Sequence, residues 1–230
     1  MAKQLPKHLI PILGKPVLYW LLLAIQQSSC CPKVCIIVKN KNSFKDAIAK
    51  LANNFSKLTI VTELVPFNVK GPWQAMGYIL QKLKHPAFFM SGDLIMPTAE
   101  NIKTFQQKCQ NAISNYEALI AGGICQPMET ASGLVVDRKK KLIGFERYNP
   151  YTGQQLVNVG CCVMTPRISE MLITAGKYAY MHKDEDYVLR HLAKRGATQV
   201  AEFRQSFVNV NTVPDCMMAE RLLSGRYCRK

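Results

Sequence analysis

The spacing of strand-like and helix-like segments constrains the fold of this chain more than any other feature. In the first half, short β-branched or aromatic apolar runs alternate with amphipathic stretches at the spacing expected of βαβ units. Such alternation predicts parallel strands in one sheet, with helices on its faces. The expected strands are residues 34–38, 58–61 and 87–90, and the expected helices are residues 16–25, 44–51, 73–83 and 97–107.

The second half of the sequence has a different texture, with short strands in close succession. We expect strands at residues 118–124, 133–137, 142–147 and 156–164, followed by helices at 166–175, 185–195 and 214–224. No internal repeat or low-complexity linker divides the chain. The sequence therefore predicts one α/β domain over residues 1–230, with a Rossmann-like, mainly parallel sheet flanked by helices. A small antiparallel excursion is expected over the carboxyl edge of that sheet.

Composition indicates a soluble protein of the cytoplasm. The longest apolar run near the start, residues 16–25, is too short to span a bilayer, and no signal-peptide cleavage site follows it. We therefore expect no membrane association. The nine cysteines lack C-x-x-C spacing and form no ligand pattern with the four histidines. Reduced thiols are the favoured interpretation, and a structural zinc site is the alternative.

The net charge of +15 is the strongest compositional bias. Such a field attracts polyanions, but the basic residues cluster only at 138–141 and 226–230, and no basic motif is interleaved with aromatics. A solvated basic surface is the favoured interpretation. The second interpretation is a positive field that attracts nucleoside triphosphates and sugar phosphates. Binding to nucleic acid is the least favoured interpretation.

Residues that directly follow strands are the candidates for ligand binding, because ligands of such sheets bind beyond the carboxyl ends of the strands. Asp93 ends an apolar strand and follows Gly92, which permits close approach of a ligand. A carboxylate in that place suits Mg²⁺, which prefers one or two carboxylates plus phosphate oxygens. The alternative is an aspartate that only caps the next turn.

Lys7 lies in a stiff, turn-rich segment, residues 6–16, of sequence PKHLIPILGKP. Prolines and the Gly14 turn favour a lysine that is held in place. Such a lysine would lie beside triphosphate oxygens if the chain before it crosses the strand ends. It could equally be one surface lysine among many.

Residues 6–16 resemble the P-K-x-L-x-P-I-x-x-K-P half of the signature of the sugar-phosphate nucleotidyltransferases. Other segments resemble that family's motifs in the same order, from residue 6 to about residue 223. They are residues 71–75 (GPWQA), 91–93 (SGD), 133–147, 157–160 (VNVG), 185–189 and 207–220. Single motifs of this kind are weak, but their collinear order is a strong indication of the family.

The resemblance implies Mg²⁺-dependent transfer of a nucleotidyl group from a nucleoside triphosphate to a sugar-1-phosphate, with release of pyrophosphate. Lys7 would bind the triphosphate, and Arg147 occupies the family's lysine position near the reacting phosphates. Asp93 would ligate Mg²⁺, with a second ligand from Asn209 or Asn211. No covalent protein nucleophile is expected, since positioning and charge neutralisation supply the rate.

The resemblance also implies two sets of binding residues. The nucleotide would be contacted by Lys7, Gly71, Gln74 and Gly92. The sugar would be contacted by Glu146, Asn158 and Gly160. The expected partners are the two small-molecule substrates, without a membrane or nucleic acid, and a homo-oligomer is compatible with the sequence.

The family's first strand and its G-x-G-T-R loop have no counterpart ahead of Pro6 in the printed sequence. Three alternative expectations follow. In the first, the printed start is an internal methionine of a longer, active enzyme. In the second, the chain is a catalytically silent relative that binds a nucleotide or a partner subunit. In the third, the chain retains weak activity through another phosphate cradle.

Overall fold

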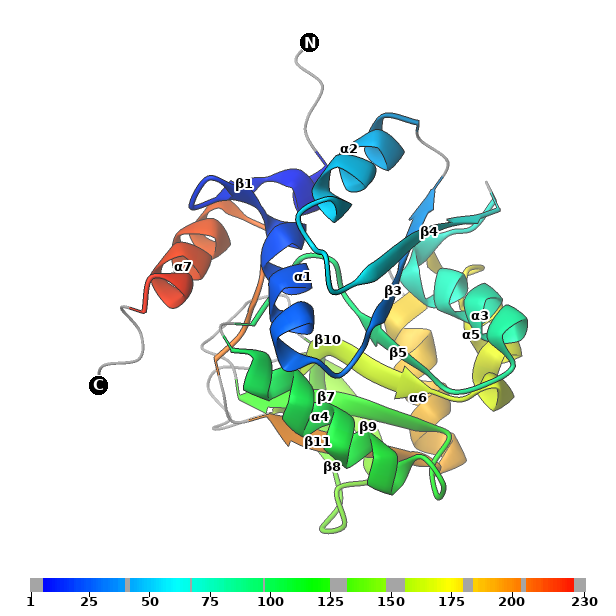
Figure 1. Cartoon of the computed structure of the whole chain (residues 1–230). Helices are drawn as coiled ribbons and strands as arrows, with labels where there is room; N and C mark the ends of the chain where they lie inside the picture. The colour runs from blue at the N-terminus through cyan, green and yellow to red at the C-terminus, as the bar shows by residue number, and fades with distance from the viewer. Residues whose placement is uncertain are drawn as a thin grey trace.

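The computed structural model of the chain describes residues 6–39, 42–66, 68–96, 98–124, 132–147, 156–179, 184–203 and 206–225. In this part the long strands form one six-stranded sheet and a separate parallel pair, and helices cover both (Figure 1). The expected α/β class is thereby confirmed.

The long strands are β3 (Lys33–Lys39), β4 (Thr59–Val65), β5 (Ala87–Met90), β7 (Ala118–Ile124), β8 (Ser132–Val136), β9 (Leu142–Arg147), β10 (Leu156–Met164) and β11 (Thr198–Phe203). Four short strands form two further pairs: β1 (Pro11–Ile12) with β2 (Lys15–Pro16), and β6 (Leu94–Ile95) with β12 (Val208–Asn209).

The helices are η1 (Lys7–Leu9), α1 (Val17–Ser28), α2 (Asn42–Ala52), α3 (Gly71–Leu83), α4 (Ala99–Ala112), η3 (Pro166–Ile168), α5 (Ser169–Ala175), α6 (Asp184–Arg195) and α7 (Val213–Leu223). Their ends follow local chemistry. At the start of α7, for example, Thr212 and Asp215 form a capping box, in which each side chain bonds the other's backbone N–H.

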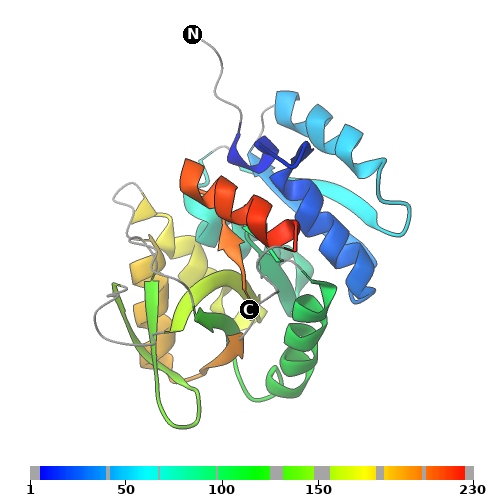
Figure 2. The same cartoon turned by 90° about the vertical axis from the view of Figure 1, so that its left-hand side faces the viewer.

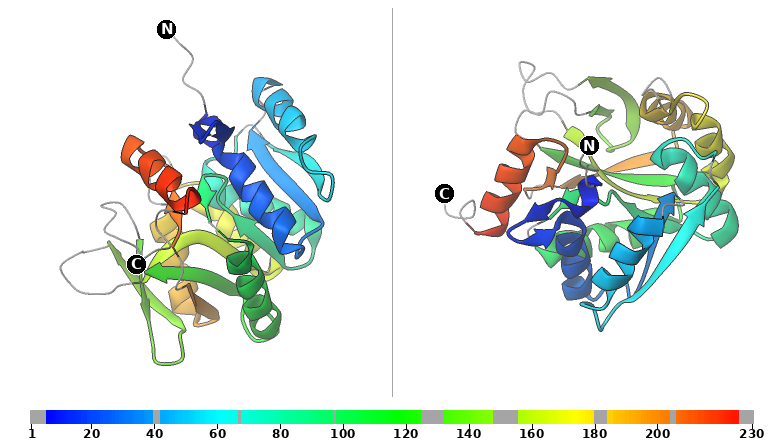
Figure 3. Two further views of the ribbon diagram at one scale, coloured as in Figure 1. Left: turned by 60° about the vertical axis from the view of Figure 1, so that its left-hand side comes forward. Right: turned by 90° about the horizontal axis from the view of Figure 1, so that it is seen from above.

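The six-stranded sheet has the order β11-β7-β10-β8-β9, with β5 paired to β10. Strand β10 is antiparallel to β5 and to β7, and β7 is parallel to β11, so β5, β7 and β11 share one direction. The hairpin β8–β9 and strand β10 are the antiparallel excursion. Strands β3 and β4 are parallel and stand apart from this sheet (Figures 1 and 3). The predicted α/β arrangement with helices on the faces of the sheet is confirmed. Its parallel pairings are β3–β4 and β7–β11, and the other four pairings of the six-stranded sheet are antiparallel.

Two apolar clusters cover the two faces of the sheet. One is formed by α1 and α4 over residues such as Leu119, Ala121 and Val163. The other is formed by α3, α5 and α6 over residues such as Ile120 and Cys162. Neighbouring residues of β7 thus alternate between clusters, as buried strands between two helical layers must.

A third cluster joins the two ends of the described chain. Ile12 and Val17 pack with Val210, Ala219 and Leu222, and all five are buried. Figure 2 shows the consequence, with α7 lying beside the N-terminal β1–β2 hairpin. This packing brings the segment of Lys7 next to the loop that follows β12.

Most predicted elements are found within one or two residues of their expected bounds. Three continue at least three residues past their predicted ends. Helix α1 continues past residue 25 to Ser28, which is also buried. Helix α4 continues past residue 107 because Cys109 and Ala112 keep its buried face. Strand β4 continues past residue 61 because it stays paired with β3 as far as Val65.

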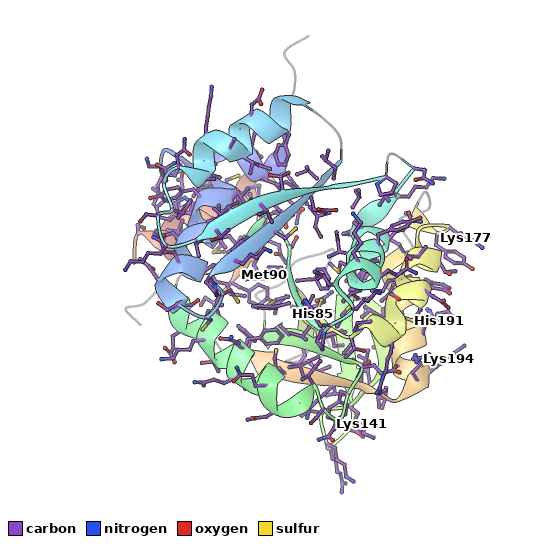
Figure 4. All side chains as sticks on the ribbon, turned by 45° about the vertical axis from the view of Figure 1, so that its right-hand side comes forward. His85, Met90, Lys141, Lys177, His191 and Lys194 are labelled. Atoms are coloured by element: carbon purple, nitrogen blue, oxygen red, sulfur yellow. The ribbon has the colours of Figure 1, made fainter. Side chains whose placement is uncertain are left out.

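None of the helices in the described ranges combines the length and the apolar character that a bilayer span requires. Seven of the nine cysteines lie in these ranges, and all seven are free thiols. Basic side chains are distributed over separate elements. Lys141 lies between β8 and β9, Lys177 follows α5, and Lys194 lies on α6 (Figure 4).

Candidate active site at the strand ends

Lys7 is the point at which three distant segments meet. Its ammonium group forms an ion pair with the carboxylate of Asp93 and donates a hydrogen bond to Oδ1 of Asn211, at 3.0 Å. Lys7 lies in η1, Asp93 follows β5, and Asn211 follows β12. The structure therefore brings together a cation, a carboxylate and an amide that the sequence predicted for one site.

Asp93 is a buried anion. Its side chain is 4% exposed, whereas that of Lys7 is 48% exposed. Burial by itself would raise the pKa of Asp93. Hydrogen bonds from Lys7 and Ser91, together with the positive charge of Lys7 and the effect of His8, outweigh burial and hold the pKa below its ordinary value. The carboxylate is therefore ionised at neutral pH.

His8 lies against this pair and was not predicted as a site residue. Burial lowers the pKa of His8, the nearby Asp93 acts in the opposite direction, and Lys7 lowers it further. Its buried Nδ1 has no hydrogen-bond partner among the residues that the structure describes. At Gly92, the nearest neighbour of an added Cβ would be this ring, at an ordinary contact distance of 3.5 Å. Protein contacts alone therefore do not demand a glycine at position 92.

The asparagines at the end of β12 are fixed by backbone hydrogen bonds. Strand β12 pairs with β6, and the N–H of Val210 donates to the carbonyl of Asp93 at 2.9 Å. Asn209 donates to the carbonyl of Val159 at 3.3 Å, and its buried Oδ1 has no partner in the described part of the chain. The Oδ1 of Asn211 accepts from Lys7. Both candidate amides thus lie beside the Asp93 loop, and the Oδ1 of Asn209 can serve as a ligand or hydrogen-bond acceptor.

The set of oxygen donors fits a hard cation. The part of the chain that the structure describes contains no cluster of three or more His, Cys, Asp or Glu side chains that could hold a metal ion. One carboxylate, an unpartnered amide oxygen and the phosphate oxygens of a substrate are the ligands that Mg²⁺ takes. The residues present therefore fit Mg²⁺ better than Zn²⁺, which prefers nitrogen and sulfur.

A bulge in β10 places Gly160 beside the Asp93 loop. The pairing of β10 with β7 shifts register between Asn158 and Cys162, and Gly160 has φ +81°. Its carbonyl accepts from the N–H of Ser91 at 2.8 Å, and an added Cβ would lie 3.2 Å from the Cβ of Ser91. A glycine is needed here for both the backbone angle and the close approach.

Asn158 is held from two sides. Its Oδ1 accepts from the N–H of Gly160 at 3.0 Å, and its Nδ2 donates to Oε1 of Glu185 at 2.7 Å. Glu185 therefore positions a predicted sugar-binding residue, which the sequence indicated only through the motif at residues 185–189.

The predicted residues of β9 are not joined to Lys7 and Asp93 by any described contact. Glu146 is exposed and faces Gly133 of β8 in the strand register. Arg147 ends β9, and its side chain lies outside the described residues. Both stay predictions.

Gly71 and Gln74 form the start of α3. Gly71 has φ +79°, and an added Cβ would lie 2.5 Å from Oδ2 of Asp184. The Oε1 of Gln74 accepts from the N–H of Lys70 at 2.6 Å, and Gly176 packs directly against the Gln74 side chain. Gln74 is thus engaged in capping α3 and joining it to the end of α5.

No family model and no curated protein matches the sequence. Solved structures match the fold over nearly the whole chain. For a UDP-glucose pyrophosphorylase the TM-score is 0.74 and the identity 16%, covering 97% of this chain and 92% of that one. For the inositol-1-phosphate CTP transferase from T. maritima the values are 0.71 and 13%, with 97% and 88% covered.

A third match is the CMP:2-keto-3-deoxy-manno-octonic acid synthetase complexed with CTP. Its TM-score is 0.72 and its identity 14%, and the match covers 98% of this chain and 95% of that chain. At such identities the similarity shows the fold alone. The chain has the fold of solved nucleotidyltransferases, which is the fold that its sequence motifs predicted.

Proposed function

We propose that this protein transfers a nucleotidyl group from a nucleoside triphosphate to a sugar-1-phosphate, giving a nucleoside diphosphate sugar and pyrophosphate. The observation that carries the proposal is the convergence of Lys7, Asp93 and Asn211 at the carboxyl end of β5. The fold adds support, because solved proteins that share it are described as acting on nucleotides and on sugars or inositol phosphate.

In the proposed reaction an oxygen of the sugar-1-phosphate attacks the α-phosphorus of the triphosphate. The new P–O bond forms as the bond between the α-phosphorus and the bridging oxygen breaks, and pyrophosphate leaves with that electron pair. No protein nucleophile takes part, so the protein's task is to position the two anions and to balance their charge.

Lys7 is suited to this task because its ammonium can exchange partners. The Lys7 side chain is half exposed and is already paired with a carboxylate. An arriving triphosphate can therefore replace Asp93 as the partner of the ammonium, which does not have to be desolvated completely. Asp93 would then share a divalent cation with the phosphates, together with Asn209 or Asn211. Bound Mg²⁺ would supply charge neutralisation on the phosphate oxygens.

The remaining predicted residues take the substrates in this proposal. Asn158 and Gly160 would bind the sugar, since the bulge of β10 contacts the Asp93 loop, and Glu146 would add a hydrogen bond. Gly71, Gln74 and Gly92 would contact the nucleotide, and Arg147 would approach the reacting phosphates. We further infer a single domain over residues 1–230, in the cytoplasm.

The test is a pyrophosphate-release assay with each nucleoside triphosphate against a panel of sugar-1-phosphates and inositol-1-phosphate, with Mg²⁺. We expect release for one pair, with at least a 100-fold loss in Asp93→Asn and in Lys7→Met, the order expected for lost charge stabilisation. Lys50→Met, an exposed lysine of α2, is the matched control and should keep full activity.

The alternative is a catalytically silent protein that binds a nucleotide or a partner. Binding of a triphosphate by calorimetry, without release of pyrophosphate for any pair, would establish that alternative and contradict the transferase proposal. If the protein neither binds a triphosphate or a partner nor releases pyrophosphate, both the transferase proposal and this alternative are contradicted.

A further inference from the structure

The ammonium of Lys7 occupies a place where oxygens from two distant segments converge. It is paired with Oδ2 of Asp93 and donates a hydrogen bond to Oδ1 of Asn211 at 3.0 Å. Both residues are candidate ligands of the divalent cation in the proposed reaction. Because the ammonium is itself a cation and already bonds both oxygens, a metal ion that takes the same two oxygens must displace Lys7.

Both carboxylate oxygens of Asp93 are engaged in this arrangement. Its Oδ1 accepts a hydrogen bond from the hydroxyl of Ser91, and its Oδ2 is paired with Lys7. The side chain is buried, and the main-chain carbonyl of Asp93 is held by the N–H of Val210 at 2.9 Å. A cation that arrives from solvent therefore meets a fixed carboxylate that already has two partners.

Lys7 can leave Asp93 without a change in the backbone. The turn η1 is closed by the N–H groups of Leu9 and Ile10, which donate to the carbonyls of Pro6 and Lys7 at 2.8 Å and 3.2 Å. The Lys7 side chain is long and half exposed, so rotation about its own bonds carries the ammonium into solvent. Of the two members of the ion pair, Lys7 is therefore the one that can move.

A second amide is unsatisfied while Lys7 is in place. The Oδ1 of Asn209 is buried and has no hydrogen-bond partner within the described ranges. It lies 3.7 Å from the position of an added Cβ on Gly160. A buried acceptor without a donor is unfavourable by about 1–3 kcal/mol, and a cation shared with Asp93 would satisfy it. The arrangement with Lys7 bound to Asp93 is therefore not the one in which every polar atom of the site has a partner.

We propose that Lys7 holds the place of the divalent cation in the free protein and blocks metal binding at Asp93 until phosphate oxygens take its ammonium. The inference rests on the proposed function, because the metal and the triphosphate of that reaction are the ligands concerned. A triphosphate supplies the negative charge with which Lys7 then pairs, and the released carboxylate takes the metal. The two ligands are therefore coupled through Lys7, and each raises the affinity for the other by the same factor.

Under this proposal, removal of Lys7 strengthens the binding of metal alone. Without the ammonium, Asp93 is a buried anion that lacks its counter-ion, and a divalent cation is a strong partner for it. If Lys7 acted only on phosphates, its removal would leave the affinity for metal alone unchanged. The two interpretations therefore differ in a measurement that involves no substrate.

Mn²⁺ alone is the probe, because it prefers the same oxygen ligands as Mg²⁺ and its free concentration is measured by electron paramagnetic resonance. We expect Lys7→Met to bind Mn²⁺ about tenfold or more tightly than the natural protein, within the usual range of coupling between sites. Lys15→Met is the matched control, since Lys15 is an exposed lysine of the same segment whose ammonium lies over the ring of Tyr19. Lys15→Met should bind Mn²⁺ like the natural protein, and Lys7→Met combined with Asp93→Asn should lose the gain.

Thermal unfolding gives a second readout. Saturating Mn²⁺ should raise the Tm of Lys7→Met clearly more than that of the natural protein, because the ion replaces the missing counter-ion. If Lys7→Met does not fold, Lys7→Gln takes its place, since its amide can still donate a hydrogen bond to Asp93 without carrying a charge.

Three results would overturn the proposal. One is the same Mn²⁺ affinity in the natural protein and in the Lys7 variant. Another is an equal gain in Lys15→Met, which would reflect the net charge of +15 and not Lys7. The third is a gain that persists with Asp93→Asn, which would mean that the ion binds elsewhere.

These results are separate from the test of the proposed function. A gain in Mn²⁺ affinity without pyrophosphate release for any pair would support the role of Lys7 and contradict the transfer reaction alone. Pyrophosphate release without a gain in Mn²⁺ affinity would contradict only the role of Lys7 as a substitute for the cation.

Discussion

The ammonium of Lys7 is bound to the carboxylate of Asp93, which the fold has otherwise removed from solvent. An ionised carboxylate at this depth is tolerated because it has a cation and a hydroxyl donor, Ser91, as partners. The pair therefore links folding stability to the proposed chemistry, since any ligand that draws Lys7 away must bring a replacement for its charge.

Replacing Lys7 by methionine should destabilise the protein by about 2 kcal/mol, because a buried carboxylate loses its counter-ion. The cost is below that of a fully buried pair, since Lys7 is half exposed. Urea unfolding measures the change. In the Asp93→Asn background the same replacement should cost clearly less, and equal costs in both backgrounds would mean that the two side chains do not interact.

The contribution of the Lys7–Asp93 ion pair to the free energy of unfolding should depend on pH in the acid range. The folded pKa of Asp93 lies below the unfolded value of about 3.9. Between these values the unfolded chain binds the extra proton, so the contribution is full above pH 5 and is lost as the pH falls below about 4. Unfolding free energies measured from pH 6 to pH 3 should fall less steeply for Asp93→Asn than for the natural protein.

Gly160→Ala should destabilise by about 1–2 kcal/mol or more, from the left-handed backbone angle and the close approach to Ser91. Gly144→Ala is the matched control in the same sheet, because its added Cβ meets Val135 at an ordinary 3.7 Å. That change should be neutral or slightly stabilising in denaturant unfolding. If both variants unfold alike, the bulge is not as tight as the structure has it.

Gly71→Ala tests the contact between α3 and α6. Gly196 also has a positive φ, but within the described ranges no atom lies within 4 Å of an added Cβ, so Gly196→Ala gives the backbone cost alone, about 1 kcal/mol. Gly71→Ala should lower the melting temperature further, because its Cβ meets the Asp184 carboxylate. Adding Asp184→Ala should recover the excess, and no recovery would place the cost elsewhere.

The candidate site could be predicted in part because its residues follow strands. Asp93 and Asn209 occur at points where an apolar run ends, which is a local property of the sequence. His8 gave no such signal, since its burial depends on Phe44 and Gly92 from two other segments. The motif at residues 71–75 predicted that Gln74 contacts the nucleotide. The hydrogen bond that its side chain accepts from the N–H of Lys70 is seen only in the tertiary structure.

The order of apolar and polar residues determined the elements, because periodicity and chain breakers act over a few residues: strands 87–90 and 156–164 are found at their predicted bounds. Only the tertiary structure decided that Lys7 meets Asp93 and Asn211, and that β3 and β4 pair apart from the six-stranded sheet. Those relationships depend on packing and pairing between segments far apart in the chain, where no local pattern specifies which partner is chosen.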